Sequence, residues 1–396
     1  MASLRTVDEA QRLVLEQAQQ LEAEIVSVER AGGRVTAADV RAQVDLPPFA
    51  SSAMDGFALR AADTPGTLAI GERIAAGRPA PRALEPGEAF AIATGGVVPE
   101  GADAVIPIEY VVVHDNDVEV PESVVQMANV RPQGGDVAAG DVVVRAGARL
   151  GPQQLGALAA AGVAELECTR VPRVAVVATG TELRAPGAEL RPGQVYEANS
   201  LLLASALTAC GAEVVRLPSV EDDVDAHRRV LARGLEHDVL VTSGGVSVGE
   251  HDLVRTIEQD LGVAEVFWGV AVKPGKPVAF GVRGPTLIFG LPGNPVSALV
   301  GCELFVKPAV RALQGLADPL PALVHGRLAR EVRRNRERDE YLRATSRIED
   351  GTVVLEPVTG QESHMIARAA TADALVLVPR GDGTVDAGAT VSFLRL

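Results

Sequence analysis

The most unusual chemical feature of the sequence is a pair of lysines, Lys273 and Lys276, inside the short segment Lys273-Pro-Gly-Lys-Pro277. The only other lysine is Lys307, so 34 of the 37 basic residues are arginine. An ammonium group is a compact point charge, whereas a guanidinium is a planar fork. Two ammonium groups on one turn indicate a site for a small oxyanion or phosphate, although two lysines on a solvated turn would give the same pattern.

Three carboxylates form a second group of candidates, because each follows a predicted strand and lies at or near the start of a helix. They are Glu182, Asp222 and Asp252. Mg²⁺ prefers a few hard oxygen ligands together with phosphate and water, so carboxylates that face two lysines across a phosphate-sized pocket fit a magnesium site. For the two aspartates, and less so for Glu182, capping of a helix N-terminus is a sufficient alternative explanation.

Four glycine-containing loops carry these candidates. They are Thr179-Gly-Thr-Glu-Leu183, the segment 242–252, the lysine turn 273–277 and Gly290-Leu-Pro-Gly-Asn-Pro295. In an open α/β sheet, ligands bind beyond the carboxyl ends of the strands, where loop N–H groups and helix N-termini attract anions. We therefore expect the four loops to border one pocket.

The composition argues against several classes of protein. With 37 Lys+Arg against 52 Asp+Glu, the formal net charge is −15, and aromatic residues are only 3%, so we expect no nucleic acid as partner. The N-terminal residues lack the basic start and apolar stretch of a secretory signal. The longest notable uncharged run, residues 284–302, contains three prolines and four glycines and does not suit a membrane-spanning helix. We expect a cytoplasmic protein with no membrane partner.

The three cysteines, Cys168, Cys210 and Cys302, lie far apart and form no Cys-x-x-Cys motif. This spacing is typical of small buried apolar side chains in a reducing compartment, and it indicates neither disulfides nor zinc.

The elements that position the four loops alternate between apolar β runs and helical patterns. We expect strands at residues 173–179, 214–220, 238–243, 265–270, 277–282 and 286–290, with helices that begin at Asn199, near Asp222, at Asp252 and at Asn294. Such alternation predicts a doubly wound α/β domain with a parallel sheet and helices on both faces.

The remaining segments have a different pattern. Thr6 and Glu9 form a capping box for a helix that is expected to end near Gln20, and a second helix is expected at residues 153–161. Residues 24–46 read as β structure and residues 51–136 as a small all-β unit. The last 80 residues contain four or five short strands, which predict a small barrel or sandwich.

The motifs and their order resemble the molybdopterin molybdenumtransferases, a bacterial enzyme family that also includes the C-terminal domain of gephyrin. The matching segments run from about residue 7 to residue 390 and comprise Pro47-Pro-Phe-Ala-Ser-Ser-Ala-Met-Asp-Gly-Phe57, Ala93-Thr-Gly-Gly96, Pro99-Glu-Gly-Ala-Asp103, Arg131, Gly134-Gly-Asp136, the four loops, Gln361 and Ser363-His364. Two local departures are Thr-Gly-Gly-Val-Val-Pro at residues 94–99, where many relatives have Thr-Gly-Ala-Pro-Val-Pro, and Pro132 after Arg131.

The resemblance implies four domains and a homodimer. The expected domains are an elongated, segment-built dimerisation domain (1–50 and 137–170), a small β domain (51–136), the α/β molybdopterin-binding domain (171–316) and a C-terminal β barrel or sandwich (317–396). The implied cleft lies between the α/β domain of one subunit and the small β domain of the other.

The implied reaction is the last step of molybdenum cofactor synthesis, in which adenylylated molybdopterin and molybdate give the cofactor, AMP and water with Mg²⁺. The family's oxyanion site matches Lys273, Lys276, Arg343 and Ser363, and Asp252 is expected to position or activate the hydrolytic water. Glu182 and Asp222 are expected near the metal and pterin phosphate. The catalytic carboxylates Asp55 and Asp136 are expected to come from the other subunit, where Thr94 and Arg131 are expected to help hold the substrate. Further substrate contacts are expected from Ser243, Gly244, Gly245, Ser247, Pro292 and Pro295, with Ser247 and the two glycine N–H groups forming a nucleotide-binding nest.

Some alternatives stay open at this stage. Arg343 follows four other arginines closely, so a solvated face would explain it, and Asp55 with Gly56 could only form a turn. The rival functions are a molybdopterin adenylyltransferase, whose fold resembles the α/β domain alone, and a non-catalytic cofactor carrier or scaffold. An adenylyltransferase and apo-molybdoenzymes are also the expected protein partners of a transferase.

Overall fold

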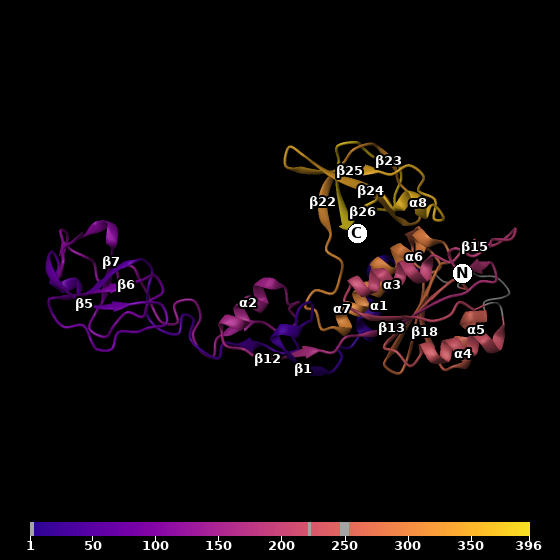
Figure 1. Ribbon diagram of the computed structural model, residues 1–396. Helices are drawn as coiled ribbons and strands as arrows, with labels where there is room; N and C mark the ends of the chain where they lie inside the picture. Colours follow the sequence, from indigo (N-terminus) through magenta and orange to yellow (C-terminus); the bar gives the residue numbers. More distant parts are fainter. Residues whose placement is uncertain (1–3, 221–222, 246–252) are drawn as a thin grey trace.

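The computed structural model describes residues 4–220, 223–245 and 253–396. Figure 1 shows an elongated molecule, with a small β unit at one end and an α/β unit at the other. A slender elongated unit joins them, and a C-terminal β unit lies beside the α/β unit. The candidate residues of the small β unit are therefore held far from those of the α/β unit within one chain.

The α/β unit contains a six-stranded sheet in the order β16-β13-β17-β21-β20-β18. Its strands are β13 (Arg173–Ala178), β16 (Glu213–Arg216), β17 (Val239–Ser243), β18 (Ala264–Trp268), β20 (Ala279–Arg283) and β21 (Thr286–Leu291). The first four in sheet order are parallel, as predicted, but β20 runs antiparallel to both of its neighbours, β21 and β18, so the prediction of a wholly parallel sheet is wrong at this edge. The reason is the two-residue connection between β20 and β21, because a parallel pair needs a long crossover.

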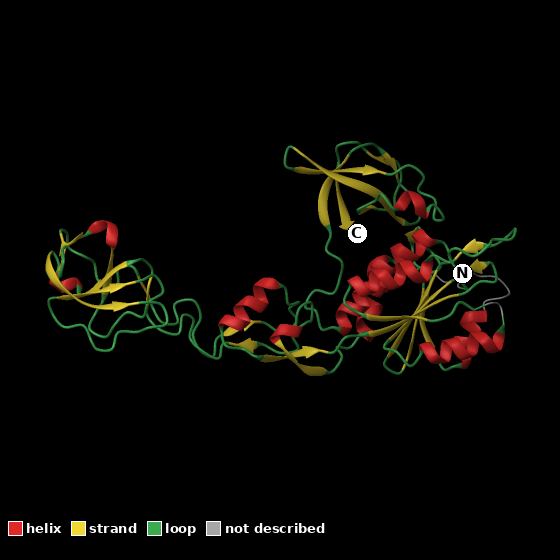
Figure 2. Cartoon of the chain, in the orientation of Figure 1, coloured by secondary structure: helices red, strands yellow, loops and turns green. Residues whose placement is uncertain are grey.

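Helices cover both faces of this sheet (Figure 2). They are α3 (Asn199–Ala209), α4 (Val224–Gly234), α5 (Leu253–Asp260), α6 (Pro295–Gly301) and α7 (Lys307–Leu313), with a π-helical turn η4 (Cys302–Val306) between the last two. Alternate residues of β13 point to opposite faces, so Val174 packs with Leu203 of α3, whereas Val177 packs with Leu231 of α4. The predicted helix starts at Asn199 and next to Asn294 are confirmed.

The first helix, α1 (Val7–Gln17), has the predicted capping box between Thr6 and Glu9. It ends three residues before the expected Gln20, whose side chain instead donates to Thr169 Oγ1 (3.0 Å). Val7 and Val14 are buried in the core of the α/β unit. By its packing, α1 therefore belongs with the α/β unit, although its place in the sequence suggested the elongated domain.

The elongated unit consists of two short ribbons and one helix. Its elements are β1 (Ala23–Ser27) paired with β12 (Glu165–Thr169), β2 (Val40–Arg41) paired with β11 (Val142–Val144), and α2 (Pro152–Ala160). Leu150, Leu158 and Leu166 pack together between these elements. Both ribbons pair segments from residues 23–41 with segments from residues 142–169, so the chain enters and leaves the small β unit through this unit.

The small β unit has a six-stranded sheet in the order β7-β4-β6-β5-β9-β8. Its strands are β4 (Gly56–Leu59), β5 (Gly66–Ile74), β6 (Glu88–Ile92), β7 (Ala104–Pro107), β8 (Val112–Val113) and β9 (Asp117–Val120), with β3 (Ser51–Ser52) paired to β10 (Val130–Arg131) at the base. Gly56 is required here by close packing, because a Cβ atom at this position would lie 1.9 Å from the Ile106 carbonyl oxygen.

The C-terminal unit is a closed barrel of five strands. They are β22 (Val324–Leu328), β24 (Asp339–Glu349), β25 (Thr352–Pro357), β26 (Ala374–Val378) and β28 (Thr390–Arg395), and the ring closes because β24 pairs with both β25 and β26. Further short elements are β14 (Leu183–Arg184) with β15 (Val195–Tyr196), β23 (Val332–Arg333) with β27 (Thr384–Val385), the helix α8 (Ile366–Ala369), and the 3-10 helices η1 (Val28–Arg30), η2 (Ala61–Asp63) and η3 (Ile108–Tyr110). Strand β19 (Val272–Lys273) adds to β24, so the lysine turn touches the barrel.

None of the helices in the described ranges is long and apolar enough to cross a lipid bilayer.

Candidate functional site

A pocket of about 630 Å³ lies at the carboxyl ends of β13, β17 and β21, where ligands of open α/β sheets bind. Three of the four predicted loops border it, through Thr179, Glu182 and Leu183, through Ser243 of the segment 242–252, and through Gly293, Asn294 and Pro295. Its remaining lining residues are Ala178, Val195, Tyr196, Glu197, Ala198, Asn199, His364 and Ile366. The last two come from the C-terminal unit, so two units of one chain form this pocket.

Asn199 connects the strands that end at the pocket. Its amide nitrogen donates to Ser243 Oγ (2.8 Å) and to the Gly293 carbonyl oxygen (2.7 Å), and its side chain is buried. Ser243 Oγ in turn donates to the Pro292 carbonyl oxygen (3.3 Å). Ser243 and Pro292 were predicted to contact the substrate, whereas Asn199 was not among the predicted site residues. In the sequence, only its position at a helix start on this rim indicates a role at the pocket.

The loop after β17 requires glycine at residue 244, because of the backbone angle and the close packing there. Gly244 has φ +96°, and a Cβ atom there would lie 2.5 Å from the Thr179 carbonyl oxygen. Its N–H donates to the Leu291 carbonyl oxygen (3.0 Å), so this N–H is not free for the predicted nucleotide nest. Gly245 also has positive φ (+70°), and Ser247 lies outside the described residues.

Glu182 is the predicted metal-site carboxylate that the structure describes, and it lines the pocket. Its carboxylate lies over Gly180, where an added Cβ atom would come within 2.5 Å of Oε2. Asp222 and Asp252, the other two predicted ligands, lie outside the described residues. The N-terminal cap of α4 is Asp223, which accepts from the Ala226 N–H (2.6 Å), so capping of this helix does not explain Asp222.

The lysine turn packs beside the pocket without lining it. A Cβ atom on Gly275 would lie 3.4 Å from the Ser297 carbonyl oxygen of α6, whose first turn borders the pocket. Lys273 Nζ forms an ion pair with Glu340 Oε1 of the barrel (2.9 Å), and Lys276 is exposed. The Lys273 ammonium group therefore stands at the junction between the α/β unit and the barrel, three residues before Lys276.

Arg343 is completely buried, which excludes the solvated-face explanation. Its Nη1 donates to the Met365 carbonyl oxygen (2.7 Å), and its Nη2 donates to those of Gly360 (2.7 Å) and Glu362 (3.2 Å). Burial lowers the pKa of the guanidinium. The predicted contact between Arg343 and an oxyanion has no support in this geometry, because the side chain does not line the pocket and holds the turn at residues 360–365 instead.

That turn brings the predicted residue Ser363 to the pocket rim. Asn294 Nδ2 donates to Ser363 Oγ (2.9 Å), and the Val296 N–H donates to the Ser363 carbonyl oxygen (3.1 Å). His364 follows directly and lines the pocket. The barrel thus supplies a hydroxyl and an imidazole to the α/β unit.

The other predicted residues gather on the small β unit. Asp55 Oδ1 accepts from the Thr94 N–H (2.7 Å). Arg131 lies on β10 and is paired with Ser51 of β3, which precedes Asp55 by four residues. Asp136 is exposed nearby in the chain segment that returns to the elongated unit. Figure 1 shows this unit at the opposite end of the molecule from the pocket, so these residues do not complete the pocket of their own chain.

The burial that was predicted for the three cysteines is confirmed. Cys168, Cys210 and Cys302 are all buried with free thiols, and burial raises the pKa of each one. Within the described ranges, no cluster of three or more His, Cys, Asp or Glu side chains is arranged to hold a metal ion.

Three family profiles match consecutive parts of the chain. The MoeA N-terminal region (domain I and II) matches residues 5–162, a probable molybdopterin binding domain matches residues 175–312, and the MoeA C-terminal region (domain IV) matches residues 325–396. The pocket therefore lies where the second and third matched regions meet.

Relatives match over nearly the whole chain. Molybdopterin molybdenumtransferase 2 of Mycobacterium tuberculosis is 38% identical, covering 97% of this chain and 98% of that protein. The molybdopterin molybdenumtransferase of Haemophilus influenzae is 34% identical, with 98% of each chain covered. The crystal structure of the molybdopterin biosynthesis MoeA protein from Pyrococcus horikoshii OT3 superposes with a TM-score of 0.87 at 27% identity and covers 100% of both chains.

Proposed function

The chain belongs to the MoeA family of molybdopterin molybdenumtransferases, and from this premise we propose how its residues insert molybdenum into molybdopterin. The observation that carries the proposal is the pocket at the carboxyl ends of β13, β17 and β21, which is closed on one side by His364 and Ile366 of the barrel. Its size suits a pterin with its phosphate group, because small-molecule sites are typically clefts of ~300–1,000 Å³.

Molybdate is a tetrahedral dianion and needs positive charge and hydrogen-bond donors. Lys273, Lys276 and Ser363 supply these at the junction of the α/β unit and the barrel, and Lys273 exchanges its Glu340 partner for the incoming oxyanion. Replacement of an oxide ligand by the two dithiolene sulfurs releases water, so two protons must reach that oxide. Glu182 and His364 line the pocket and are placed to move these protons.

Magnesium fits the residues at this rim, because Glu182 offers a carboxylate that lines the pocket. Glu182 would hold the ion together with Asp222 and Asp252. A bound Mg²⁺ would neutralise phosphate charge and polarise the adenylyl bond. Asp252 positions the water that cleaves this bond and releases AMP.

A second copy of the chain supplies the remaining residues. Asp55 and Thr94 are exposed and hydrogen-bonded to each other far from the pocket of their own chain, as a site completed between subunits requires. In the homodimer, Asp55, Thr94, Arg131 and Asp136 of one subunit face the pocket of the other. The enzyme works in the cytoplasm, receives its substrate from an adenylyltransferase and passes its product to apo-molybdoenzymes.

The test is AMP release from adenylylated molybdopterin with Mg²⁺, measured with and without molybdate, together with reconstitution of an apo-molybdoenzyme. We expect molybdate-dependent AMP release with reconstitution. Binding of the substrate without AMP release would instead indicate a carrier or scaffold. Formation of adenylylated molybdopterin from ATP, without molybdenum insertion, would indicate an adenylyltransferase.

A further inference from the structure

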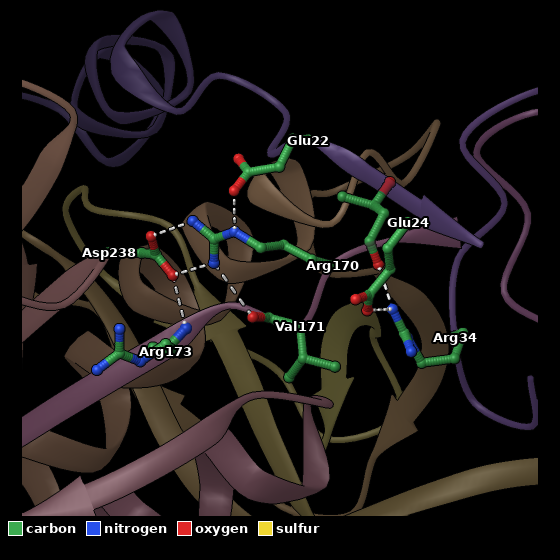
Figure 3. A network of polar contacts seen from close by, with 8 residues as sticks. Glu22, Glu24, Arg34, Arg170, Val171, Arg173 and Asp238 are labelled. Atoms are coloured by element: carbon green, nitrogen blue, oxygen red, sulfur yellow. Dashed lines mark hydrogen bonds and ion pairs between the residues drawn. The ribbon is translucent and has the colours of Figure 1, made fainter. Parts of the chain in front are cut away.

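A network of charged side chains joins the elongated unit to the α/β unit (Figure 3). Arg170 directly follows β12, and its Nη1 and Nη2 donate to Asp238 Oδ2 (2.7 Å) and Oδ1 (2.6 Å). Its Nε donates to Glu22 Oε1 (2.6 Å), and Glu22 directly precedes β1. The guanidinium therefore links the residue before β1 to the α/β unit, and its own residue directly follows β12.

Asp238 is firmly fixed in the α/β unit. Its Oδ2 accepts from the Arg173 N–H (2.7 Å), its N–H donates to the Arg173 carbonyl oxygen (3.0 Å), and its carbonyl oxygen accepts from the Leu287 N–H (2.9 Å). Asp238 directly precedes β17, and the other end of that strand carries Ser243 at the pocket. The two-bond geometry restricts the angle between the guanidinium and carboxylate planes, which a single-bond pair would not.

The direction of the β1/β12 ribbon decides where the small β unit lies. Figure 1 shows the small β unit beyond the far end of the elongated unit, so a small rotation at the junction becomes a large displacement at Asp55. A second contact limits this rotation: Arg149 Nη2 donates to Gln314 Oε1 (2.6 Å) and to the Cys210 carbonyl oxygen (3.2 Å). Arg149 and Arg170 together hold the junction at two points.

We propose that Arg170 is a positioning residue for molybdenum insertion: its paired bonds to Asp238 set the direction of the elongated unit and thereby the place at which the small β unit presents Asp55 and Thr94. The inference rests on the proposed function, in which a small β unit of one chain completes the pocket of another. Arg170 itself contacts no pocket residue, so its effect on the reaction is transmitted by geometry.

The test compares Arg170→Gln with Arg34→Gln in the full-length enzyme. Arg34 is a matched control because it pairs with Glu24 of β1 (Figure 3) and donates to the Thr169 carbonyl oxygen of β12, so these contacts stay within the elongated unit. For Arg170→Gln we expect a kcat lower by about 10- to 100-fold, since a misplacement of about 1 Å can cost that much. The Kd of molybdate should stay within about twofold of wild type, and that of adenylylated molybdopterin should rise by less than kcat falls, because the lysine turn and the pocket of the α/β unit are unchanged.

Small-angle X-ray scattering supplies a readout that does not depend on activity. Arg170→Gln should broaden or shift the distribution of intramolecular distances, whereas Arg34→Gln should leave it unchanged. Arg170→Lys keeps the charge but loses the fork, so it should fold like wild type and show an intermediate kcat. An Arg170→Gln or Arg170→Lys variant with the kcat of Arg34→Gln would overturn the inference, as would a loss of substrate affinity equal to the loss of kcat. A wild-type enzyme without AMP release would instead refute the proposed function.

Discussion

Asn199 donates a hydrogen bond of 2.8 Å to Ser243 Oγ and thereby ties the start of α3 to the end of β17 at the floor of the pocket. The same amide group donates to Gly293, so one buried side chain holds three chain segments together. Its Oδ1 is buried and has no hydrogen-bond partner among the described residues.

Asn199→Ala should therefore destabilise the fold and the pocket together. It leaves the buried Ser243 Oγ without its amide donor, which costs about 1–3 kcal/mol, and the Kd of adenylylated molybdopterin should rise. Thermal unfolding and isothermal titration calorimetry measure the two effects. The control is Asn294→Ala, which removes an exposed hydrogen bond at the same rim and should cost less than about 1 kcal/mol. Equal substrate affinity in Asn199→Ala and wild type would contradict this role.

Removal of Lys273 should impair the use of molybdate more than the binding of the pterin. Lys273→Ala should raise the KM for molybdate by about tenfold or more, since a charge-assisted contact contributes about 1.5–3 kcal/mol. Glu340→Gln removes the resident partner of Lys273 and should lower this KM or leave it unchanged. Steady-state AMP release at varied molybdate measures both values. An increase of KM in Glu340→Gln equal to that in Lys273→Ala would show that the ion pair only holds the barrel in place.

Arg343 should act through the turn that it holds. Arg343→Met leaves the Gly360 and Met365 carbonyl oxygens without their guanidinium donor, whereas the Glu362 carbonyl oxygen keeps the Met365 N–H, so we expect a loss of about 2–4 kcal/mol of stability and faster amide exchange at residues 360–365. Arg347→Met is the matched control, because Arg347 lies on the same strand and forms an exposed pair with Glu349. A direct role in oxyanion binding would instead appear as a raised KM for molybdate with normal exchange at the turn.

Acidification should weaken the junction between the elongated and α/β units. Burial alone would raise the pKa of Asp238, but hydrogen bonds from Arg170 and from the Arg173 N–H outweigh it and hold the pKa below its usual value. The unfolded chain then binds a proton at a higher pH than the folded chain does, so stability falls as the pH drops below about 5. Asp238→Asn should lower stability near pH 7 and flatten this acid limb. Thermal unfolding of both proteins between pH 3 and pH 7 measures the difference, and parallel curves would refute the assignment.

Local patterns in the sequence predict much of this fold. Patterns of neighbouring residues predict the helix starts at Asn199 and near Asn294 and the strands before them. They also predict the capping box of Thr6 and Glu9. The antiparallel edge was missed because the pattern of alternating elements outweighed the two-residue connection between β20 and β21.

The candidate site is less accessible to sequence reasoning, because its residues meet only in the tertiary structure. Burial of Arg343 depends on carbonyl groups about 20 residues away, and no local pattern shows that its donors are already used. The roles of Asn199 and Arg170 also arise from partners distant in sequence, Ser243 and Asp238. Sequence patterns identified the loops, whereas the partners of their side chains required the structure.

The central claim is that one active site combines the pocket of one chain with the small β unit of another. Glu182→Gln and Asp55→Asn should each abolish molybdate-dependent AMP release, since every site of either homodimer then lacks one carboxylate. Mixing the two variants under conditions of subunit exchange should restore about a quarter of the wild-type rate, because half of the dimers are mixed and each has one intact site of two. A mixture that stays inactive while the subunits demonstrably exchange would contradict the claim and place both carboxylates in the same chain's site.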